Sequence, residues 1–222
     1  MCLMVKSILF ENVLPKVFIG SPPEGGPSDV WGCNLLFEKG CSVLIESASG
    51  RGKSSFCSFV YGLRNDYVGN ICLMNDAGEM LPHTSEVSCE LRRRGIAMMF
   101  QELRLFPELT AVENVMLKNS ITGLFDENDV RGMLCELGLE ARLDVPCAIL
   151  SFGQLQRVAF VRMLAQPADF YLLDEPVSHL DEENSIKMGR MLRERQCKDG
   201  AGVIVTSIGR RLAYDFDTVL RL

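Results

Sequence analysis

The first residues that could do chemistry lie in segment 46–55, Glu-Ser-Ala-Ser-Gly-Arg-Gly-Lys-Ser-Ser, directly behind the apolar run 42–45. Glycines let backbone N–H groups approach phosphate oxygens closely, Lys53 supplies a positive charge, and Ser54 supplies a hydroxyl for Mg²⁺. A helix beginning near Ser54 would also point the positive end of its dipole at the anion. The segment therefore predicts a loop that binds a nucleoside triphosphate. Its expected binding residues are Ser49, Gly50, Arg51, Gly52, Lys53, Ser54 and Ser55.

One position of this loop departs from the G-x-x-x-x-G-K-[ST] pattern, because Ser47 stands where the first glycine belongs. Serine is small, so we interpret the substitution as a mild defect. A Gly-Lys-Ser triplet alone is a weak signal, since it also occurs in polar turns before helices. The interpretation therefore depends on the segments that follow.

Two adjacent carboxylates, Asp174 and Glu175, follow the apolar run 170–173. At the end of a buried strand, Asp174 could hold Mg²⁺ directly or through water. Glu175 could orient and deprotonate the water that attacks in an in-line phosphoryl transfer. The alternative is an acidic turn at a strand end, which Pro176 and Asp181 disfavour.

Four segments follow the phosphate-binding loop in a fixed order. They are 100–102 (FQE), 150–157 (LSFGQLQR), 171–176 (YLLDEP) and 178–181 (SHLD). This order and spacing resemble the ATP-binding cassette family, the ATPase subunits of ABC transporters, over nearly the whole chain. The resemblance implies an α/β fold: a P-loop NTPase with a RecA-like parallel-sheet core, an N-terminal antiparallel β subdomain and an inserted α-helical subdomain. It also implies one ATPase domain, 1–222, with the core at about 1–101 and 158–222 and the helical subdomain at about 102–157.

The resemblance assigns roles to residues outside the loop. Gln101 is expected to bridge Mg²⁺ and the lytic water, so the expected catalytic residues are Lys53, Gln101 and Glu175. The expected metal ligands are Ser54, Gln101 and Asp174. In the family, segment 150–154 caps the γ-phosphate held by a second copy, which implies a head-to-tail homodimer that buries two ATP molecules. The remaining expected ATP-binding residues are Phe18, Ser151, Gly153, Gln154 and Asp181.

Several positions depart from the family pattern or leave alternatives open. Phe152 replaces a glycine where two backbones approach closely, and the ring either clashes or points aside. Ser207 replaces the switch histidine after the last core strand, which would weaken γ-phosphate stabilisation. His179 is either a plain interface residue or a group that reaches the partner's site in trans. Phe18 is the expected stacking partner of adenine, Trp31 is a substitute, and either could be ordinary core.

Composition favours one compact chain. Its 222 residues carry a formal charge of −6 at a pI near 5.1, which disfavours a broad nucleic-acid surface. No apolar run approaches the roughly 18–20 residues that span a bilayer, and no secretory signal is recognisable at the start. We therefore expect a cytoplasmic protein. The nine cysteines have no C-x-x-C pair and are interpreted as reduced core residues, and His83 as solvated.

The resemblance also implies a partner. Residues 92–115 are most similar to the ATPases of lipoprotein release, cell division and macrolide export, so we expect a separately encoded transmembrane permease. The chain would then sit peripherally at the inner face of the cell membrane, bound only through that partner. Candidate docking contacts are Leu103, Leu105 and Phe106, although core packing explains them almost as well.

Two functions from different classes remain open. The first is a transport or mechanotransmission motor driven by ATP hydrolysis. The second is a nucleotide-gated binding subunit with little turnover, which Phe152 and Ser207 favour and the intact Lys53, Asp174 and Glu175 oppose. A small-molecule kinase is disfavoured because it does not predict segment 150–154.

Hydrophobic periodicity and turn residues predict the elements that position these groups. We expect helices at 54–62, 126–137, 151–165 and 181–195, and a surface loop at 20–27. We expect strands at 7–10, 30–37, 41–45, 69–74, 95–100, 170–173, 202–206 and 218–220.

Overall fold

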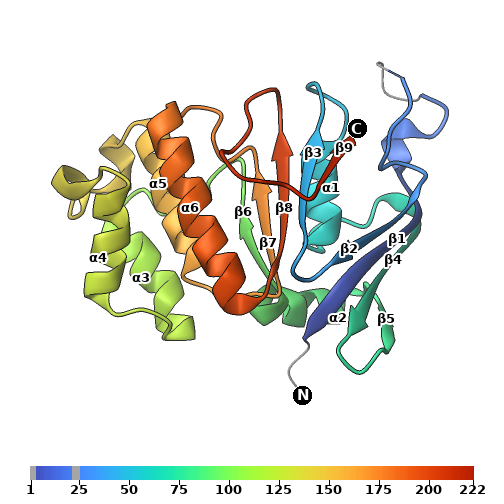
Figure 1. Ribbon diagram of the computed structural model, residues 1–222, viewed down its shortest axis with the longest axis horizontal. Coiled ribbons are helices and arrows are strands. Elements are labelled where there is room, and N and C mark those ends of the chain that lie inside the picture. Colours follow the sequence, from blue (N-terminus) through green and yellow to red (C-terminus); the bar gives the residue numbers. More distant parts are fainter. Residues whose placement is uncertain (1–3, 22–25) are drawn as a thin grey trace.

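The computed structural model describes residues 4–21 and 26–222, which form two β-sheets and a group of helices. Figure 1 shows the parallel sheet in the middle of the molecule, the antiparallel sheet on one side of it and α3 to α6 on the other. Within the described residues, no helix is both long enough and apolar enough to cross a membrane.

The parallel sheet has the strand order β6-β7-β8-β3-β9. Its strands are β3 (Ser42–Glu46), β6 (Ile96–Met99), β7 (Phe170–Asp174), β8 (Gly202–Ser207) and β9 (Thr218–Arg221). Every residue of β7 and β8 is buried, as expected for strands covered on both faces. Because the carboxyl ends of parallel strands meet at one edge, the loops after β3, β6, β7 and β8 are brought together there.

The antiparallel sheet has the order β2-β1-β4-β5. Its strands are β1 (Val5–Pro15), β2 (Asn34–Glu38), β4 (Tyr67–Asn75) and β5 (Met80–Pro82). It packs on α1 (Lys53–Val60) through aromatic rings, since the Phe56 centroid lies 5.3 Å from Phe10 and 5.6 Å from Phe37. The second sheet therefore supports the helix that follows the phosphate-binding loop.

Five longer helices and four short turns complete the described chain. They are α2 (Ser85–Glu90), α3 (Ala111–Thr122), α4 (Glu127–Glu136), α5 (Phe152–Leu164), α6 (Glu182–Asp199), η1 (Lys16–Phe18), η2 (Leu91–Gly95), η3 (Glu140–Arg142) and η4 (Cys147–Ile149). Side-chain caps fix where several of them begin. Reciprocal capping boxes start α3 at Thr110 and α4 at Asp126, and Gly138 in left-handed conformation (φ 70°) ends the α4 turn.

Two hydrophobic clusters divide the core along the parallel sheet. In β3, Leu44 belongs to the cluster shared with α3 to α6, whereas its neighbours Val43 and Ile45 belong to the cluster shared with α1 and the antiparallel sheet. Strand β8 alternates in the same way, with Val203 facing the first cluster and Ile204 the second. The parallel sheet thus separates the two hydrophobic clusters, one on each of its faces.

The α/β architecture agrees with the fold class expected from the sequence, and most expected elements are found within a few residues of their bounds. The strand expected at 30–37 begins only at Asn34, because residues 30–33 form a turn that buries Val30 and Trp31. Helices α2 and α3 and strand β5 were not expected. Residues 22–25 of the expected loop and Cys2 lie outside the described residues.

Two smaller expectations were wrong. The cysteines are free among the described residues, but only Cys57 and Cys147 are buried, and four thiols are exposed. His83 is half-buried rather than solvated, and burial, with the charge of Arg92, lowers its pKa to about 4.

Two helical glycines give a matched test of packing on α6. A Cβ at Gly189 would lie 1.9 Å from the carbonyl oxygen of Ala213, whereas a Cβ at Gly132 of α4 meets nothing within 4 Å. Alanine favours a helix by about 1 kcal/mol over glycine. We expect Gly132→Ala to raise the free energy of unfolding by up to about that amount. Gly189→Ala should lower it by about 1–3 kcal/mol because backbone must move. Urea unfolding measures both, and equal gains would contradict the close approach.

Candidate functional site

The phosphate-binding loop leaves the carboxyl end of β3 and is shaped by two glycines in left-handed conformation. Gly50 has φ 81° and Gly52, at the start of α1, has φ 93°. At Gly52 space is also short, because a Cβ would meet the rings of Phe18 and Trp31 at 3.1 Å. Glycine is therefore required at position 52 by both backbone conformation and packing.

The ammonium of Lys53 is buried inside this loop, with only 5% of the residue exposed. Its Nζ donates to the carbonyl of Ala48 at 2.9 Å and to the carbonyl and hydroxyl oxygens of Ser47 at 3.3 Å each. Burial lowers the pKa of Lys53, and the charges of Glu175 and Asp174 act in the opposite direction. Ser47, the departure from the expected glycine, thus adds a hydroxyl to the surroundings of the charge.

Three oxygen-bearing side chains meet beside Lys53 at the carboxyl edge of the sheet. The Ser54 hydroxyl donates to Oε1 of Gln101 at 3.2 Å. Asp174 ends β7, is 3% exposed, and accepts a 2.5 Å hydrogen bond from the Thr206 hydroxyl of β8. Burial raises the pKa of Asp174, although hydrogen bonds from Thr206 and Ser54 oppose the shift. The structure therefore brings together Ser54, Gln101 and Asp174, the three expected metal ligands.

Glu175 follows Asp174 in an uncommon backbone conformation. Its φ is 52°, a left-handed value that a non-glycine residue adopts at a cost. Its N–H donates to the carbonyl of Thr206 at 3.1 Å, and Gln156 of α5 donates to its carbonyl at 3.4 Å. The carboxylate lies 3.9 Å from Nζ of Lys53. Burial raises the pKa of Glu175, Lys53 lowers it and Asp174 raises it further.

This group of residues has the donor set of a magnesium–phosphate site. Hydroxyl, amide and carboxylate oxygens suit Mg²⁺, which in such sites keeps waters and substrate phosphates as further ligands. No cluster of three or more His, Cys, Asp or Glu that could hold a metal occurs in the part of the chain that the structure describes. The residues therefore fit an ion that arrives with a phosphate rather than one held by protein alone.

The segment expected to cap a partner's phosphate begins α5. Ser151 is its N-cap, and Ser151 and Gln154 form a capping box, with Gln154 N–H donating to the Ser151 hydroxyl at 3.3 Å. No hydrogen bond or ion pair joins Ser151, Gly153 or Gln154 to Lys53 among the described residues. Within one chain the structure thus leaves the two groups separate.

The ring of Phe152 points aside and packs on the segment after β7. Its centroid lies 4.5 Å from that of His179 in an edge-to-face contact, and 44% of the residue remains exposed. His179 Nδ1 lies 2.9 Å from the Ser178 hydroxyl, which also accepts from Gln156 at 3.0 Å. Phe152 is therefore accommodated within the chain by its contact with the His179 ring.

Three other residues singled out by the sequence have local partners. The carboxylate of Asp181 caps α6 by accepting from the Asn184 N–H at 2.8 Å. The Ser207 hydroxyl is 2% exposed and donates to the carbonyl of Arg210 at 2.6 Å. Trp31 is buried and donates from Nε1 to the Arg51 carbonyl at 3.0 Å, so it supports the loop from the core.

The remaining residues of the phosphate-binding loop and Phe18 lie around its outer side. Ser49 and Gly50 are exposed, and the Ser55 hydroxyl accepts from Arg64 at 3.1 Å. Phe18 in η1 is partly exposed, with its ring 6.5 Å from that of Trp31. Sequence reasoning missed Thr206, Gln156 and Ser178, whose roles depend on contacts between strands and loops.

Comparisons with known proteins agree on one family. The family model described as ABC transporter matches residues 31–178. The chain is 33% identical over 194 residues to the lipoprotein-releasing system ATP-binding protein LolD of Legionella pneumophila (strain Lens), covering 86% of this chain and 85% of that one. It is 31% identical over 195 residues to the ABC transporter ATP-binding protein YbbA of Escherichia coli (strain K12), covering 86% of this chain and 84% of that one.

A solved structure also matches. A dimeric post-hydrolysis state of the cassette MJ0796 bound to ADP and Pi has a TM-score of 0.71 at 26% identity, covering 90% of this chain and 87% of that one.

The raised pKa of Asp174 predicts a stability effect with a defined sign. Its folded pKa lies above the ordinary value of 3.8, so the fold loses stability as pH rises from 3.8, and the loss is complete above the folded pKa. We expect Asp174→Asn to increase the free energy of unfolding near neutral pH, and the gain to disappear as pH falls below 3.8. Urea unfolding across this pH range measures it.

A carboxylate with the opposite shift is the control. Arg64 holds the pKa of Asp66 below 3.8, so Asp66→Asn should lower stability near neutral pH by a small amount that fades as pH falls through that lowered pKa. A loss of stability for Asp174→Asn at neutral pH would contradict the expectation that burial of the Asp174 carboxylate costs more than its hydrogen bonds return.

Proposed function

Because this chain belongs to the ATP-binding subunits of ABC transporters, we propose that it clasps Mg-ATP between Lys53 of one copy and Ser151 of another. The family is an ATPase family, and ATP with Mg²⁺ is its substrate complex. The observation that supports this placement is the meeting of Lys53, Ser54, Gln101, Asp174 and Glu175 at one edge of the sheet. In this proposal the second half of the site comes from another copy, since no hydrogen bond joins Ser151 to Lys53 among the described residues.

In this proposal the loop residues bind the triphosphate. The N–H groups of the residues 49–55 and the positive end of α1 face the phosphates, and Lys53 exchanges its carbonyl partners for phosphate oxygens. Phe18, which lies beside Gly52, stacks on the adenine. Ser54, Gln101 and Asp174 hold Mg²⁺, which when bound neutralises charge that develops on the phosphate oxygens.

Glu175 is the proposed general base. Burial raises the pKa of Glu175, and a carboxylate with a raised pKa is a better proton acceptor than an exposed one. Thr206 and Gln156 hold its backbone on both sides, so the carboxylate is oriented before substrate arrives. It would take the proton of the water that attacks the terminal phosphate, with Gln101 positioning that water.

Ser151, Gly153, Gln154 and Asp181 would complete the site across a head-to-tail homodimer. In the single chain, the Ser151 N–H donates to the Gln154 side chain and the Gln154 N–H donates to the Ser151 hydroxyl. The start of α5 carries the positive end of the helix dipole. In the dimer this helix start would face the partner's terminal phosphate. The solved relative MJ0796 is dimeric with ADP and Pi, which supports a dimeric arrangement.

ABC ATP-binding subunits pair with transmembrane permease components. We propose that this chain pairs with a separately encoded permease and works at the cytoplasmic face of the membrane only through it. LolD is named as part of a lipoprotein-releasing system, and a similar export role is the nearest candidate here. Residues of about 102–157 would move as a helical subdomain against a core of about 1–101 and 158–222. This movement would transmit closure of the ATP-bound dimer to the permease.

The candidate contacts with the permease are reduced to one surface residue. Leu103 is 4% exposed and Leu105 packs against the core, whereas Phe106 is 50% exposed. Phe106 lines a groove between α3, α5 and β6, which is the proposed docking surface.

Glu175→Gln tests hydrolysis. We expect ATP turnover to fall by about 100-fold or more because the base is lost, while Mg-ATP binding is kept and the dimer accumulates. Steady-state phosphate release, calorimetry and size-exclusion chromatography with ATP measure the three effects. Glu183→Gln, on the exposed side of α6, is the matched control. Equal, near-zero turnover in the wild type and Glu175→Gln would instead favour a nucleotide-gated binding subunit.

A double substitution tests what His179 does. If His179 mainly holds the Phe152 ring aside, His179→Ala should slow turnover several-fold, and adding Phe152→Gly should restore it because no ring is left to interfere. We expect this restoration, measured as turnover of the two single variants and the double variant. A double variant as slow as His179→Ala alone, with Ser207→His giving no gain, would favour His179 acting in the partner's site.

A further inference from the structure

The turn that follows Gln101 has a costly backbone conformation. Leu103 has φ 60° and Arg104 has φ 50°, the only two neighbouring non-glycine residues in left-handed conformation among the described residues. Such a conformation is sterically unfavourable for a residue with a Cβ, so it persists only where the surrounding structure holds it. Within the turn, the Leu103 N–H donates to the carbonyl of Phe100 at 3.0 Å and the Arg104 N–H to that of Glu102 at 2.6 Å. We call residues 101–104 the left-handed turn.

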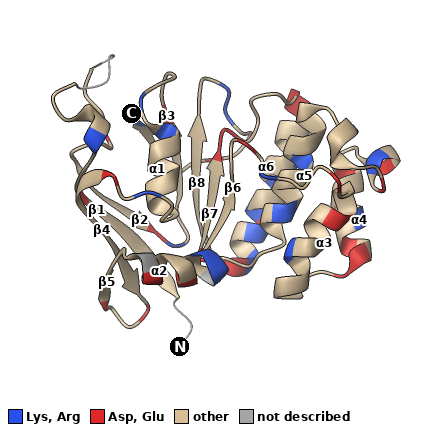
Figure 2. Ribbon diagram, turned by 180° about the vertical axis from the view of Figure 1, so that it is seen from behind, with Lys and Arg blue, Asp and Glu red and all other residues tan. Residues whose placement is uncertain are grey.

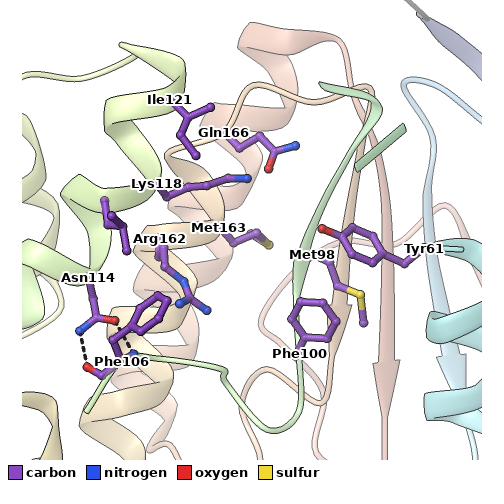
Figure 3. Close-up of a pocket in the computed structure, with 11 residues that line it drawn as sticks. Tyr61, Met98, Phe100, Phe106, Asn114, Lys118, Ile121, Arg162, Met163 and Gln166 are labelled. Atoms are coloured by element: carbon purple, nitrogen blue, oxygen red, sulfur yellow. Dashed lines mark hydrogen bonds between the residues drawn. The ribbon is translucent and has the colours of Figure 1, made fainter. Parts of the chain in front are cut away.

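The guanidinium of Arg162 in α5 holds this turn from outside. Its Nη1 donates to the carbonyl of Arg104 and its Nη2 to the carbonyl of Leu103, each at 2.6 Å. Figure 3 shows Arg162 extending from α5 toward the segment that follows Phe100. A planar guanidinium presents its donors in a rigid fork, so one side chain fixes the directions of two successive carbonyls.

Arg162 has no carboxylate partner among the described residues, although the chain is rich in carboxylates. There are 29 acidic and 23 basic residues, and Figure 2 shows acidic positions on both halves of the fold. Burial lowers the pKa of Arg162, and the groups that oppose this shift are the Cys147 thiol and the Tyr61 hydroxyl. A half-buried charge needs hydrogen-bond acceptors, and here the left-handed turn provides them. The arginine and the turn therefore stabilise each other.

The left-handed turn begins with a residue of the candidate site. The Gln101 side chain makes one hydrogen bond among the described residues, from the Ser54 hydroxyl to its Oε1 at 3.2 Å, and the residue is exposed. Its placement therefore depends on the backbone that follows. Gln156, six residues before Arg162 and so about 9 Å away along α5, donates to the carbonyl of Glu175 at 3.4 Å. One helix thus contacts the backbone beside both groups.

We infer that Arg162 is a positioning residue for Gln101. By holding the left-handed turn, it fixes where the Gln101 side chain lies relative to Mg²⁺ and the attacking water. This role rests on the proposed function for what Gln101 does. It adds that α5 places both groups that act on the water, since Gln156 of the same helix holds the backbone of Glu175.

Hydrogen–deuterium exchange of the nucleotide-free chain tests the contact itself. Arg162→Lys keeps the charge but cannot bond both carbonyls in the same geometry, so the amides of the left-handed turn should exchange about tenfold faster. The matched control is Arg193→Lys, because Arg193 is a half-buried arginine of α6 that also donates to a loop carbonyl, that of Asp215 at 2.8 Å. It should leave exchange of the turn unchanged. Unchanged exchange in Arg162→Lys would overturn the inference.

Steady-state ATP turnover tests the consequence. Arg162→Lys should lower kcat about tenfold and keep the KM for ATP within about twofold, because Gln101 is misplaced while the phosphate-binding loop is intact. The Mg²⁺ concentration for half-maximal turnover should rise several-fold, and Arg193→Lys should change none of the three. A loss of kcat that only follows a loss of folded protein in circular dichroism, with the Mg²⁺ dependence unchanged, would show a structural role alone and overturn the inference.

A second substitution separates holding the turn from general packing. Asparagine tolerates left-handed backbone better than arginine, so adding Arg104→Asn to Arg162→Lys should recover part of the lost turnover. A double variant as slow as Arg162→Lys alone would contradict the role of the turn. Absence of turnover in the wild type would contradict the proposed function, whereas the exchange comparison decides by itself whether Arg162 holds the turn.

Discussion

The buried positive charge of Lys53 is the constraint on which the carboxyl edge of the parallel sheet depends. A buried ammonium must find hydrogen bonds and opposite charge, and here the carbonyl of Ala48 and the carboxylate of Glu175 provide them. Ala48 follows β3 and Glu175 follows β7, with β8 paired to both strands. The register of three neighbouring strands is therefore what makes the charges meet. Thr206 at the end of β8 reinforces it by bonding both Asp174 and the backbone of Glu175.

Much of this edge could be predicted from the sequence because its causes are local. The apolar runs before Glu46 and Asp174 are typical of strands buried on both faces, and both strands are found there. Gly50 and Gly52 adopt the left-handed conformations that the loop pattern requires. The helices expected to begin near 126 and 181 are also found there, with Asp126 and Asp181 as their caps, since a capping bond spans only three residues.

What could not be predicted depends on contacts between distant segments. The ring of Phe152 contacts His179, which lies twenty-seven positions further along the sequence. No local sequence pattern predicts that contact. The Ser207 hydroxyl donates to the carbonyl of Arg210. This bond depends on the conformation of the loop after β8, which the sequence pattern does not predict. Helix α3 was missed because two asparagines interrupt its buried face, yet Thr110 followed by Glu113 was a capping-box signal that could have revealed it.

The left-handed backbone of Glu175 has a consequence for how this chain can drift in evolution. A glutamate is held there at a conformational cost, next to a second carboxylate that burial disfavours in its ionised form. Glycine or asparagine tolerates such a backbone better, so replacing the glutamate relaxes the polypeptide while removing the proposed base. Mutational pressure on folding alone thus acts against a glutamate at this position, and selection for the role proposed for Glu175 is what would retain it.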